Sequence, residues 1–241
     1  MLKKIKTFFK ELFKPMPLDN NFRDYDEYWE NRGFHAPSLN RAKIISKYVE
    51  SGSKILDIGC GDGTVIEFLS KNNKPKEIIG IDISKRAVDY VKNKGYEVYE
   101  LDVLSDDFNK FLENKKFDYI IITEVLEHIQ EPERVMADIK NHFTKSVFIS
   151  IPNAGFFMHR LRLLFGRFPV IVIAQHVKEH IRFWTHKDFI YWCNYFGFEV
   201  EDYFVSSGLD FKSLRFLENL FPALFANQIL YKLSIKNEKN K

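Results

Sequence analysis

Short apolar runs alternate with segments of helical periodicity along most of this chain. The runs predict strands at Lys54–Ile58, Glu77–Ile83, Glu97–Leu101, Phe117–Thr123 and Ser146–Ile151, separated by helices at Thr64–Lys71, Lys85–Lys94, near Asp106–Glu113 and near Pro132–His142. Near-continuous apolar strands are typical of parallel sheets that are covered on both faces. Strands and helices that alternate in this order predict an α/β fold built on a doubly wound sheet.

The pattern changes after Pro152. Residues 153–183 form an insertion rich in aromatic residues and arginine, and segments of that length are usually functional lids or binding segments. Beyond the insertion we expect a helix near Lys187–Tyr195, a strand near Phe198–Val205, a helix at Leu214–Ala226 and a final strand at Ile229–Ile235. The sequence therefore predicts seven strands in one domain over residues 22–241, with a lid insertion at about residues 153–183.

The first 14 residues predict a basic amphipathic helix, and residues 15–21 a linker. One helical face carries Leu2, Ile5, Phe8, Phe9, Leu12 and Phe13, and lysines occupy most of the other positions. Two interpretations are open. The helix either lies in a membrane interface or packs on the sheet or a second subunit.

Composition narrows the function classes. The chain has 241 residues, is 45% hydrophobic and carries a net charge of +3, which is enough for one sizeable core and too little to indicate nucleic acid. No apolar run reaches the roughly 18 residues that span a bilayer, and no secretory signal pattern is evident. The two cysteines, Cys60 and Cys193, make neither a disulfide framework nor a zinc cluster. We expect a cytoplasmic protein without a nucleic-acid partner.

The strongest chemical signal is a glycine-rich turn after the first predicted strand. The run from Asp57 to Gly63 reads D-I-G-C-G-D-G, and Asp82 ends the second strand. Glycine lets the backbone approach a ligand, and a carboxylate at the tip of the next strand can accept both ribose hydroxyls. Asp82 could instead cap the following helix, although Ser84 can do so in its place. The sequence predicts a nucleoside-cofactor site.

The spacing disfavours a dinucleotide. A G-x-G-x-x-G fingerprint would need glycine at Thr64, and Asp57 would face a diphosphate poorly but suits an ammonium group. The pattern D-x-G-x-G-x-G resembles the first motif of class I S-adenosylmethionine (SAM) methyltransferases. That resemblance implies a Rossmann-like fold whose last strand is antiparallel beside the fifth. It also implies SAM as cofactor. The methionine tail of SAM would then lie at Asp57, Gly59, Cys60 and Gly61, and its ribose at Asp82 and Ile83. The adenine would lie at Asp102 and Val103, with Glu124 in the pocket wall. For Asp102 a plain turn role is the alternative.

The segment from Glu124 to His128 reads E-V-L-E-H and resembles the ExLEH segment of UbiG-type ubiquinone O-methyltransferases. In those proteins such residues can hold a divalent cation, which implies a magnesium or manganese site at Glu124, Glu127 and His128. Alternatively, Glu124 lines the cofactor pocket, and Glu127 and His128 support the turn through hydrogen bonds. We favour this second interpretation and expect no metal.

Other residues are candidates for the acceptor side. His180 and His128 are candidate general bases, because histidine titrates near neutrality. A helix at Tyr25–Arg32 is expected to cap the pocket. The aromatic residues expected to cover it are Phe156, Phe157, Phe183 and Trp184. The basic residues Arg160, Arg162 and Arg167 indicate either an acidic substrate or a solvated helical face.

The insertion also carries a family resemblance. Pro152-Asn153, Arg160-Leu161-Arg162 and Gly166-Arg167-Phe168-Pro169 are similar to segments of MetW-like methyltransferases, and the similarity runs from about Ser53 to Phe196. Either resemblance implies a methyltransferase, and we expect it to act on a hydroxyl of a small-molecule, lipid-linked or glycan-type acceptor. The MetW resemblance also implies the alternative of a non-catalytic, SAM-binding accessory subunit. Candidate partners are a biosynthetic protein, a second copy, and the inner membrane face through residues 1–14.

Overall fold

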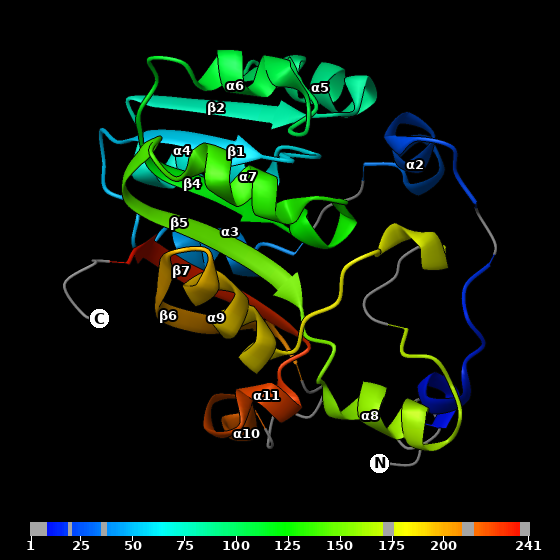
Figure 1. The fold of residues 1–241 in the computed structure, drawn as a ribbon. Coiled ribbons are helices and arrows are strands. Elements are labelled where there is room, and N and C mark those ends of the chain that lie inside the picture. Colours follow the sequence, from blue (N-terminus) through cyan, green and yellow to red (C-terminus); the bar gives the residue numbers. More distant parts are fainter. Residues whose placement is uncertain (1–8, 19–20, 35–37, 171–175, 209–214, 237–241) are drawn as a thin grey trace.

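Figure 1 shows the computed structural model, in which helices cover both faces of one seven-stranded sheet. The structure describes residues 9–18, 21–34, 38–170, 176–208 and 215–236. The strands are β1 (Lys54–Ile58), β2 (Glu77–Asp82), β3 (Glu97–Glu100), β4 (Phe117–Thr123), β5 (Phe143–Pro152), β6 (Phe198–Ser207) and β7 (Gln228–Ile235). Their spatial order is β3-β2-β1-β4-β5-β7-β6.

The first five strands are parallel, as their apolar runs predict. β1 pairs in parallel with β2 and β4, β2 pairs with β3, and β4 pairs with β5. β7 is antiparallel to both β5 and β6, between which it lies. The expected α/β, Rossmann-like sheet with its last strand antiparallel beside the fifth is therefore confirmed.

The helices follow the predicted pattern, with one correction. They are α2 (Tyr25–Arg32), α3 (Asn40–Ile45), α4 (Thr64–Asn73), α5 (Lys85–Lys92), α6 (Asp106–Leu112), α7 (Pro132–Ile139), α8 (Phe157–Leu164), α9 (His186–Tyr195), α10 (Phe216–Leu220) and α11 (Pro222–Phe225), with 3₁₀ turns η1 (Leu126–His128) and η2 (Val177–Glu179). The single helix expected at Leu214–Ala226 is wrong. Pro222 has no backbone N–H to donate, so the chain breaks there into α10 and α11. Leu214 lies outside the described residues.

Side chains at the helix starts explain where several helices begin. The Asp24 carboxylate accepts from the Glu27 N–H at the start of α2, at 2.9 Å. The Ser84 hydroxyl accepts from the Ala87 N–H at the start of α5, and the Thr185 hydroxyl accepts from the Asp188 N–H at the start of α9. Such caps satisfy N–H groups that have no partner inside the helix. The side chain that caps α5 is therefore that of Ser84 and not that of Asp82. The interpretation of Asp82 as a ribose ligand requires this.

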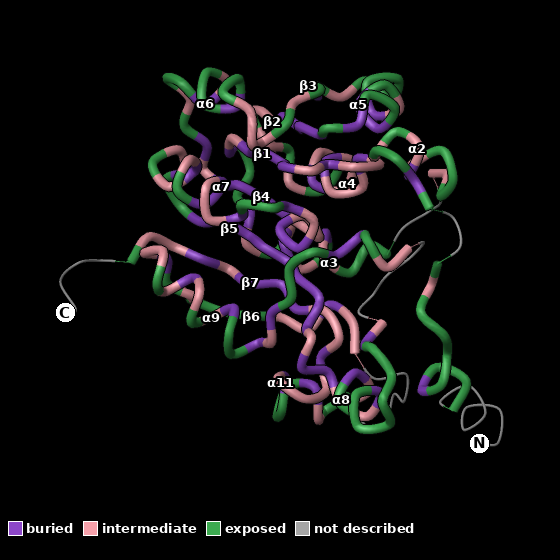
Figure 2. Tube along the Cα trace, turned by 45° about the vertical axis from the view of Figure 1, so that its right-hand side comes forward, coloured by how far each residue is buried: buried purple, intermediate pink, exposed green. Residues whose placement is uncertain are grey.

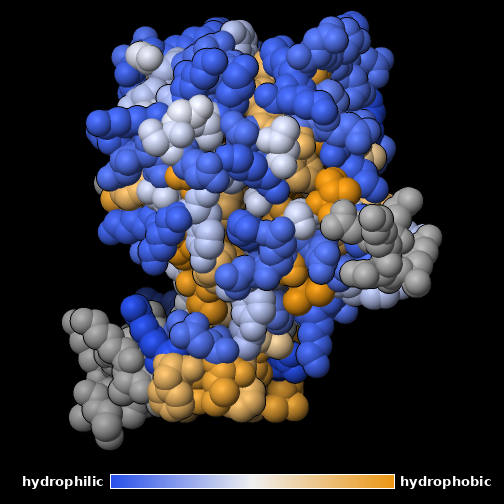
Figure 3. Space-filling view, turned by 90° about the vertical axis from the view of Figure 1, so that its left-hand side faces the viewer, coloured by the Kyte–Doolittle hydropathy of each residue, from blue (hydrophilic) through white to orange (hydrophobic). Residues whose placement is uncertain are grey.

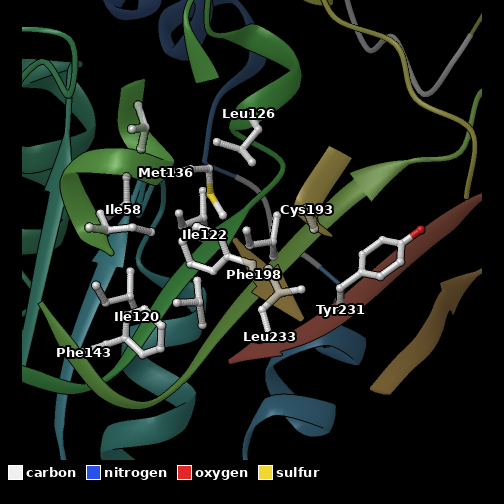
Figure 4. Packing of buried hydrophobic residues seen from close by; sticks show 14 of the residues in the cluster. Ile58, Ile120, Ile122, Leu126, Met136, Phe143, Cys193, Phe198, Tyr231 and Leu233 are labelled. Atoms are coloured by element: carbon white, nitrogen blue, oxygen red, sulfur yellow. The ribbon is translucent and has the colours of Figure 1, made fainter. Parts of the chain in front are cut away.

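Two apolar layers hold the helices to the sheet. Figure 4 shows the larger one, in which Ile120, Ile122 and Met136 pack together under α7, and it extends to Cys193 of α9. The opposite face is covered by α3 and α4. Burial in Figure 2 is concentrated along the central strands β1, β4 and β5. Shortening one of these fully buried side chains to alanine would cost about 2–5 kcal/mol of stability.

Within the described ranges, no helix is both long enough and apolar enough to cross a bilayer. Most of the expected N-terminal helix lies outside those ranges, because residues 1–8 are not described. Residues 9–13 are helical, which agrees with the predicted amphipathic helix over the part that the structure describes.

Candidate functional site

A cavity of about 590 Å³ opens at the carboxyl ends of the parallel strands. It lies where β1 and β4 are neighbours, so that the crossovers on either side run in opposite directions along the sheet. Ligands of open α/β sheets bind at such a switch point. Of the candidate cofactor, metal and base residues named from the sequence, eleven line the cavity: Gly59, Cys60, Gly61, Asp82, Ile83, Asp102, Val103, Glu124, Glu127, His128 and His180. Asp57 lies behind this wall.

The glycine turn has the shape that its sequence requires. Gly59 has φ +67°, and a Cβ there would come within 2.4 Å of the Val125 side chain. Gly61 has φ +53°, and a Cβ there would lie 2.9 Å from the Trp29 ring. A side chain at either position would strain the backbone and collide with a neighbour. These two glycines allow β1, the E-V-L-E-H segment and α2 to approach one another.

Most backbone N–H groups of the turn donate within the protein. Those of Gly59 and Cys60 both donate to the Ile81 carbonyl oxygen, at 2.8 and 3.0 Å. The Gly61 N–H donates to Asp82 Oδ2 at 2.8 Å, and the Thr64 N–H donates to Asp62 Oδ1 at 3.0 Å. A phosphate-binding loop must offer such donors to its ligand. This turn therefore makes a poor cradle for a phosphate.

Carboxylates dominate the charge around the turn. Asp82 is buried, and its second oxygen accepts from the Ser84 N–H at 2.9 Å. Burial raises the pKa of Asp82, whereas the two N–H donors act in the opposite direction. Asp57 is only 1% exposed, and within the described part of the chain neither of its carboxylate oxygens has a hydrogen-bond partner. Burial therefore raises the pKa of Asp57 well above its ordinary value. A cationic group near this wall would relieve the cost of burying both acids.

Asp102 has a different environment. It is exposed at the cavity edge, where Oδ1 accepts from the Leu104 N–H at 2.8 Å. Its carbonyl oxygen accepts from the Ser105 N–H and hydroxyl. These contacts are those of a turn residue, yet its neighbour Val103 also lines the cavity. Both interpretations made from the sequence remain compatible with this geometry.

Helix α2 forms part of the cavity wall and lies beside the ends of β1 and β2 (Figure 1). It has the bounds expected for the capping helix, and Tyr25, Tyr28 and Trp29 face the cavity from it. Asp26 ties α2 to α5, because Oδ1 accepts from the Ser84 hydroxyl at 2.6 Å and from the Arg86 N–H at 2.9 Å. α2 is thereby held against the glycine turn.

Glu124 holds a strained position at the end of β4. Its φ is +57°, a conformation that costs a residue with a side chain about 1 kcal/mol or more. Its carboxylate accepts from the Ser150 hydroxyl at 2.8 Å and from Gln228 Nε2 at 2.5 Å. Sequence reasoning missed Gln228, since its only signal was a place at the start of the final strand. Two strands and a strained backbone thus orient Glu124 into the cavity.

Glu127, His128 and His180 come together, and each offers one ligand atom within 4.8 Å of the others. Glu127 is 1% exposed, and neither of its carboxylate oxygens has a hydrogen-bond partner among the residues that the structure describes. Glu127 instead supports this region through its main-chain carbonyl oxygen, which accepts from the Ile181 and Arg182 N–H groups at 2.9 and 3.1 Å, and not through its carboxylate. Burial, and then the charge of Glu124, raise the pKa of Glu127 well above its ordinary value.

His128 is positioned by the insertion. Its Nδ1 lies 2.5 Å from the Glu179 carbonyl oxygen, and the rings of His128 and His180 lie 4.7 Å apart. Since a carbonyl can only accept, Nδ1 carries the proton and Nε2 of the neutral ring is basic. Burial lowers the pKa of His128, which favours this neutral form. Glu127 and the two histidines also form a donor set that fits a divalent cation, with His180 in the place that the sequence gave to Glu124.

The insertion contributes less to the cavity wall than the sequence indicated. Of its described residues, Glu179 and His180 line the cavity. Phe156, Phe157, Phe183 and Trp184, expected to cover the pocket, are not among the lining residues. Trp184 instead packs against Phe189 of α9, with ring centroids 5.7 Å apart. The sequence shows that these positions are aromatic, but it does not show which neighbours they pack against. The aromatic wall of the cavity comes from α2 instead.

A family model described as methionine biosynthesis protein MetW matches residues 40–233. The chain belongs to the MetW family. A curated relative of this MetW-family chain, the ubiquinone biosynthesis O-methyltransferase of Coxiella burnetii, is 22% identical over 191 residues, 73% of this chain and 78% of that enzyme. The (S)-tetrahydroprotoberberine N-methyltransferase of Eschscholzia californica is 27% identical over 99 residues, 40% of this chain. That match spans only 28% of the enzyme's length.

Solved structures show the same fold. A SAM-dependent methyltransferase from Archaeoglobus fulgidus superposes with a TM-score of 0.60 at 19% identity, covering 88% of this chain and 100% of that one. A chain from the complex between the Haloferax volcanii Trm112 methyltransferase activator and a methyltransferase gives 0.65 at 13% identity, covering 90% and 100%. The MetW-family chain therefore has the fold of SAM-dependent methyltransferases.

Proposed function

We propose that this protein binds SAM and transfers its methyl group to a hydroxyl of a small-molecule, lipid-linked or glycan-type acceptor. The observation that supports this proposal best is that N–H groups of the glycine turn already donate hydrogen bonds to oxygens of the protein, while buried carboxylates lie beside them. Phosphates need free donors, whereas an ammonium or sulfonium group needs acceptors and negative charge. The cavity offers the second environment, through Asp57, Asp82 and Glu127.

Each side of the cavity has a role in this proposal. The turn at Gly59, Cys60 and Gly61, with Asp57 behind it, holds the methionine tail. Asp82 accepts from the two ribose hydroxyls with Ile83 beside it, and Asp102 accepts from the adenine amino group while the Val103 N–H donates to the ring. Glu124 borders the cofactor on the β4 side. When bound, SAM supplies a methyl group on a positively charged sulfur, which is already a strong donor.

The chain's own contribution to chemistry is orientation and proton removal. His128 Nε2 is the basic nitrogen of a ring whose tautomer the Glu179 carbonyl determines, so it can take the acceptor's hydroxyl proton. His180, whose ring lies 4.7 Å away, is the second candidate base. The aromatic wall of α2 excludes water from the same space. Residues 153–183 serve as the lid under which the acceptor enters, with Glu179 and His180 at its inner edge.

We also propose that Glu127, His128 and His180 hold a divalent cation such as magnesium or manganese. The unpartnered, buried carboxylate of Glu127 supports this, because an isolated buried charge is costly unless it is paired or coordinates a metal. A cation here would bind His128 Nε2, so this role excludes that of His128 as the base. The cation would instead act as a Lewis acid and lower the pKa of an acceptor hydroxyl. The metal-free interpretation is the alternative, because the Glu127 carbonyl oxygen and His128 Nδ1 do make hydrogen bonds to the insertion.

A second candidate function is a SAM-binding accessory subunit without catalysis. The match to the methionine biosynthesis protein MetW over residues 40–233 favours it. In that case the cavity would hold SAM, and a stable complex with a biosynthetic enzyme would replace turnover.

Isothermal titration calorimetry with SAM, S-adenosylhomocysteine and NADH tests the binding step. We expect saturable binding of the first two and none of NADH, and absence of heat and thermal shift with both adenosyl ligands would exclude the proposal. Release of S-adenosylhomocysteine across a panel of hydroxylated acceptors tests catalysis. SAM binding without turnover, together with a protein that co-purifies in fixed ratio, would favour the accessory subunit.

A further inference from the structure

A buried arginine joins the N-terminal segment to α8. Arg162 is 3% exposed, and its Nη1 donates to the carbonyl oxygens of Glu11 and Leu12, at 2.5 and 3.0 Å. Its Nη2 donates to the Lys14 carbonyl at 2.8 Å. These carbonyls end the helical residues 9–13, where such groups have no partner within a helix. Neither of the roles considered from the sequence, an acidic substrate or a solvated face, applies to Arg162.

This junction presents an apolar surface to solvent. We call residues 9–18 and 157–168 the basal surface. Leu163, Leu164 and Phe165 are 59%, 75% and 54% exposed, and Phe13 remains 46% exposed although its ring packs 5.7 Å from that of Phe165. Large side chains are rarely exposed together on a soluble protein unless the surface binds something. Figure 3 shows the side of the molecule on which α10 and α11 lie, and hydrophobic side chains also gather at the lower end of that side, where Phe216 and Leu220 of α10 are exposed.

The charges of the basal surface indicate the kind of partner. Its two segments contain five basic residues, Lys10, Lys14, Arg160, Arg162 and Arg167, and one acid, Glu11. Over the whole chain the 36 basic and 33 acidic residues are nearly balanced. Lys10, Lys14 and Arg167 are exposed among the apolar side chains. Protein interfaces are depleted in lysine at their centres, whereas interfacial helices combine bulky apolar side chains with lysine and arginine.

We propose that the basal surface docks on a bilayer that contains anionic phospholipid. Leu164, Phe165 and Phe13 enter the acyl boundary while Lys10, Lys14 and Arg167 contact the head groups. Docking uses two segments that Arg162 holds together, rather than residues 1–14 alone. This docking does not require that the protein transfers a methyl group.

The basal surface is also connected to the cavity. The Val177 N–H donates to the Pro17 carbonyl oxygen at 3.0 Å, so the segment that follows the N-terminal helix holds η2. Glu179 and His180, which line the cavity, follow directly. If the proposed function holds, docking of the basal surface therefore acts on the segment that carries two residues of the cavity wall.

Co-sedimentation of the full chain with vesicles tests the docking. With equal parts phosphatidylglycerol and phosphatidylcholine we expect most of the protein in the pellet, and more than tenfold weaker partitioning with pure phosphatidylcholine or in 1 M salt. The double substitution Leu164→Glu, Phe165→Glu should also weaken partitioning more than tenfold. The matched control is Tyr191→Glu, Tyr195→Glu on α9, where the side chains are 71% and 74% exposed. It adds the same charge and should change partitioning less than twofold.

Circular dichroism and S-adenosylhomocysteine titration of both variants establish that they fold, independently of vesicle binding. Equal partitioning with both vesicle types, or an equal effect of the two double substitutions, would overturn the proposal. Another outcome would assign the surface to a second copy of the chain. In that case the protein would not bind vesicles, light scattering would show a dimer, and the double substitution Leu164→Glu, Phe165→Glu would dissociate it. Loss of adenosyl-ligand binding with vesicle binding retained would count against the proposed function only.

Discussion

The two sides of the cavity are built differently. On the glycine-turn side, Gly59 and Gly61 follow β1 and Asp82 ends the neighbouring β2. The Gly59 N–H donates to the Ile81 carbonyl and the Gly61 N–H to Asp82. On the side of the candidate bases, His128 meets His180 from the distant insertion, and Glu124 meets Gln228 from the last strand. The first side rests on local sequence and backbone geometry, and the second on long-range packing. Binding of the cofactor should therefore be the more robust property, and acceptor chemistry the more easily altered one.

The largest effect is expected at Asp82. Asp82→Ala removes the proposed acceptor of both ribose hydroxyls and the partner of the Gly61 N–H. Since each charge-assisted hydrogen bond contributes about 1.5–3 kcal/mol, we expect S-adenosylhomocysteine affinity to fall about a thousandfold by calorimetry.

Asp118→Ala is the matched control for this substitution. Asp118 also accepts from a backbone N–H, that of Lys54 at 2.9 Å, but at the opposite end of the strands. Affinity should change less than twofold there. Similar losses in both variants would mean that the effect is one of folding, and unchanged affinity in Asp82→Ala would remove the ribose assignment.

The next effect concerns the stability in acid of the insertion that carries His180. Burial in α8 lowers the pKa of His159 to about 4, whereas the unfolded chain protonates it near the ordinary value of 6.5. The unfolded state therefore binds more protons, so stability is complete above pH 6.5 and is lost as pH falls toward 4. The loss amounts to about 2 kcal/mol between pH 7.5 and 5.

Urea unfolding of the wild type and His159→Gln at both pH values measures this contribution. The variant should lose about 2 kcal/mol less than the wild type over that interval. Identical losses in the two proteins would show that His159 is not kept neutral by its burial.

A smaller effect tests the cation proposal. Glu127→Gln should weaken manganese binding at least tenfold in calorimetry, because it removes the charged ligand of the cluster. Glu133→Gln is the control, since Glu133 accepts from Trp192 Nε1 at 3.1 Å and lies outside the cluster. Manganese binding of equal strength in both variants would place the ion elsewhere, and no binding to the wild type would restore the metal-free interpretation.

The smallest effect is expected at α2. Asp26→Ala removes the contacts to Ser84 and Arg86 that hold this helix against the turn. We expect about threefold weaker S-adenosylhomocysteine binding, together with faster hydrogen exchange in residues 25–32, because loosening the helix lowers the binding-competent fraction. Unchanged exchange would show that the aromatic contacts of α2 suffice to hold it.

The sequence predicted the parallel sheet and the glycine-turn side well, because buried strands and turns leave local patterns. Alternating glycines and strand-terminal acids placed the cavity, and the bounds of α2 followed from Y-D-E-Y-W-E-N-R. The sequence did not reveal that His180 joins Glu127, that Gln228 holds Glu124, or that Arg162 is buried. Each depends on two segments more than 50 residues apart, and no local periodicity records such a pairing.

The strand order has a consequence for synthesis. β7 is the last strand along the chain, but it lies between β5 and β6. Until the ribosome releases β7, the nascent sheet ends at β5 with an unpaired edge, and β6 has no partner to join. Open edges of this kind pair with other chains, so the risk of aggregation in the cell is concentrated in the interval between translation of β5 and of β7.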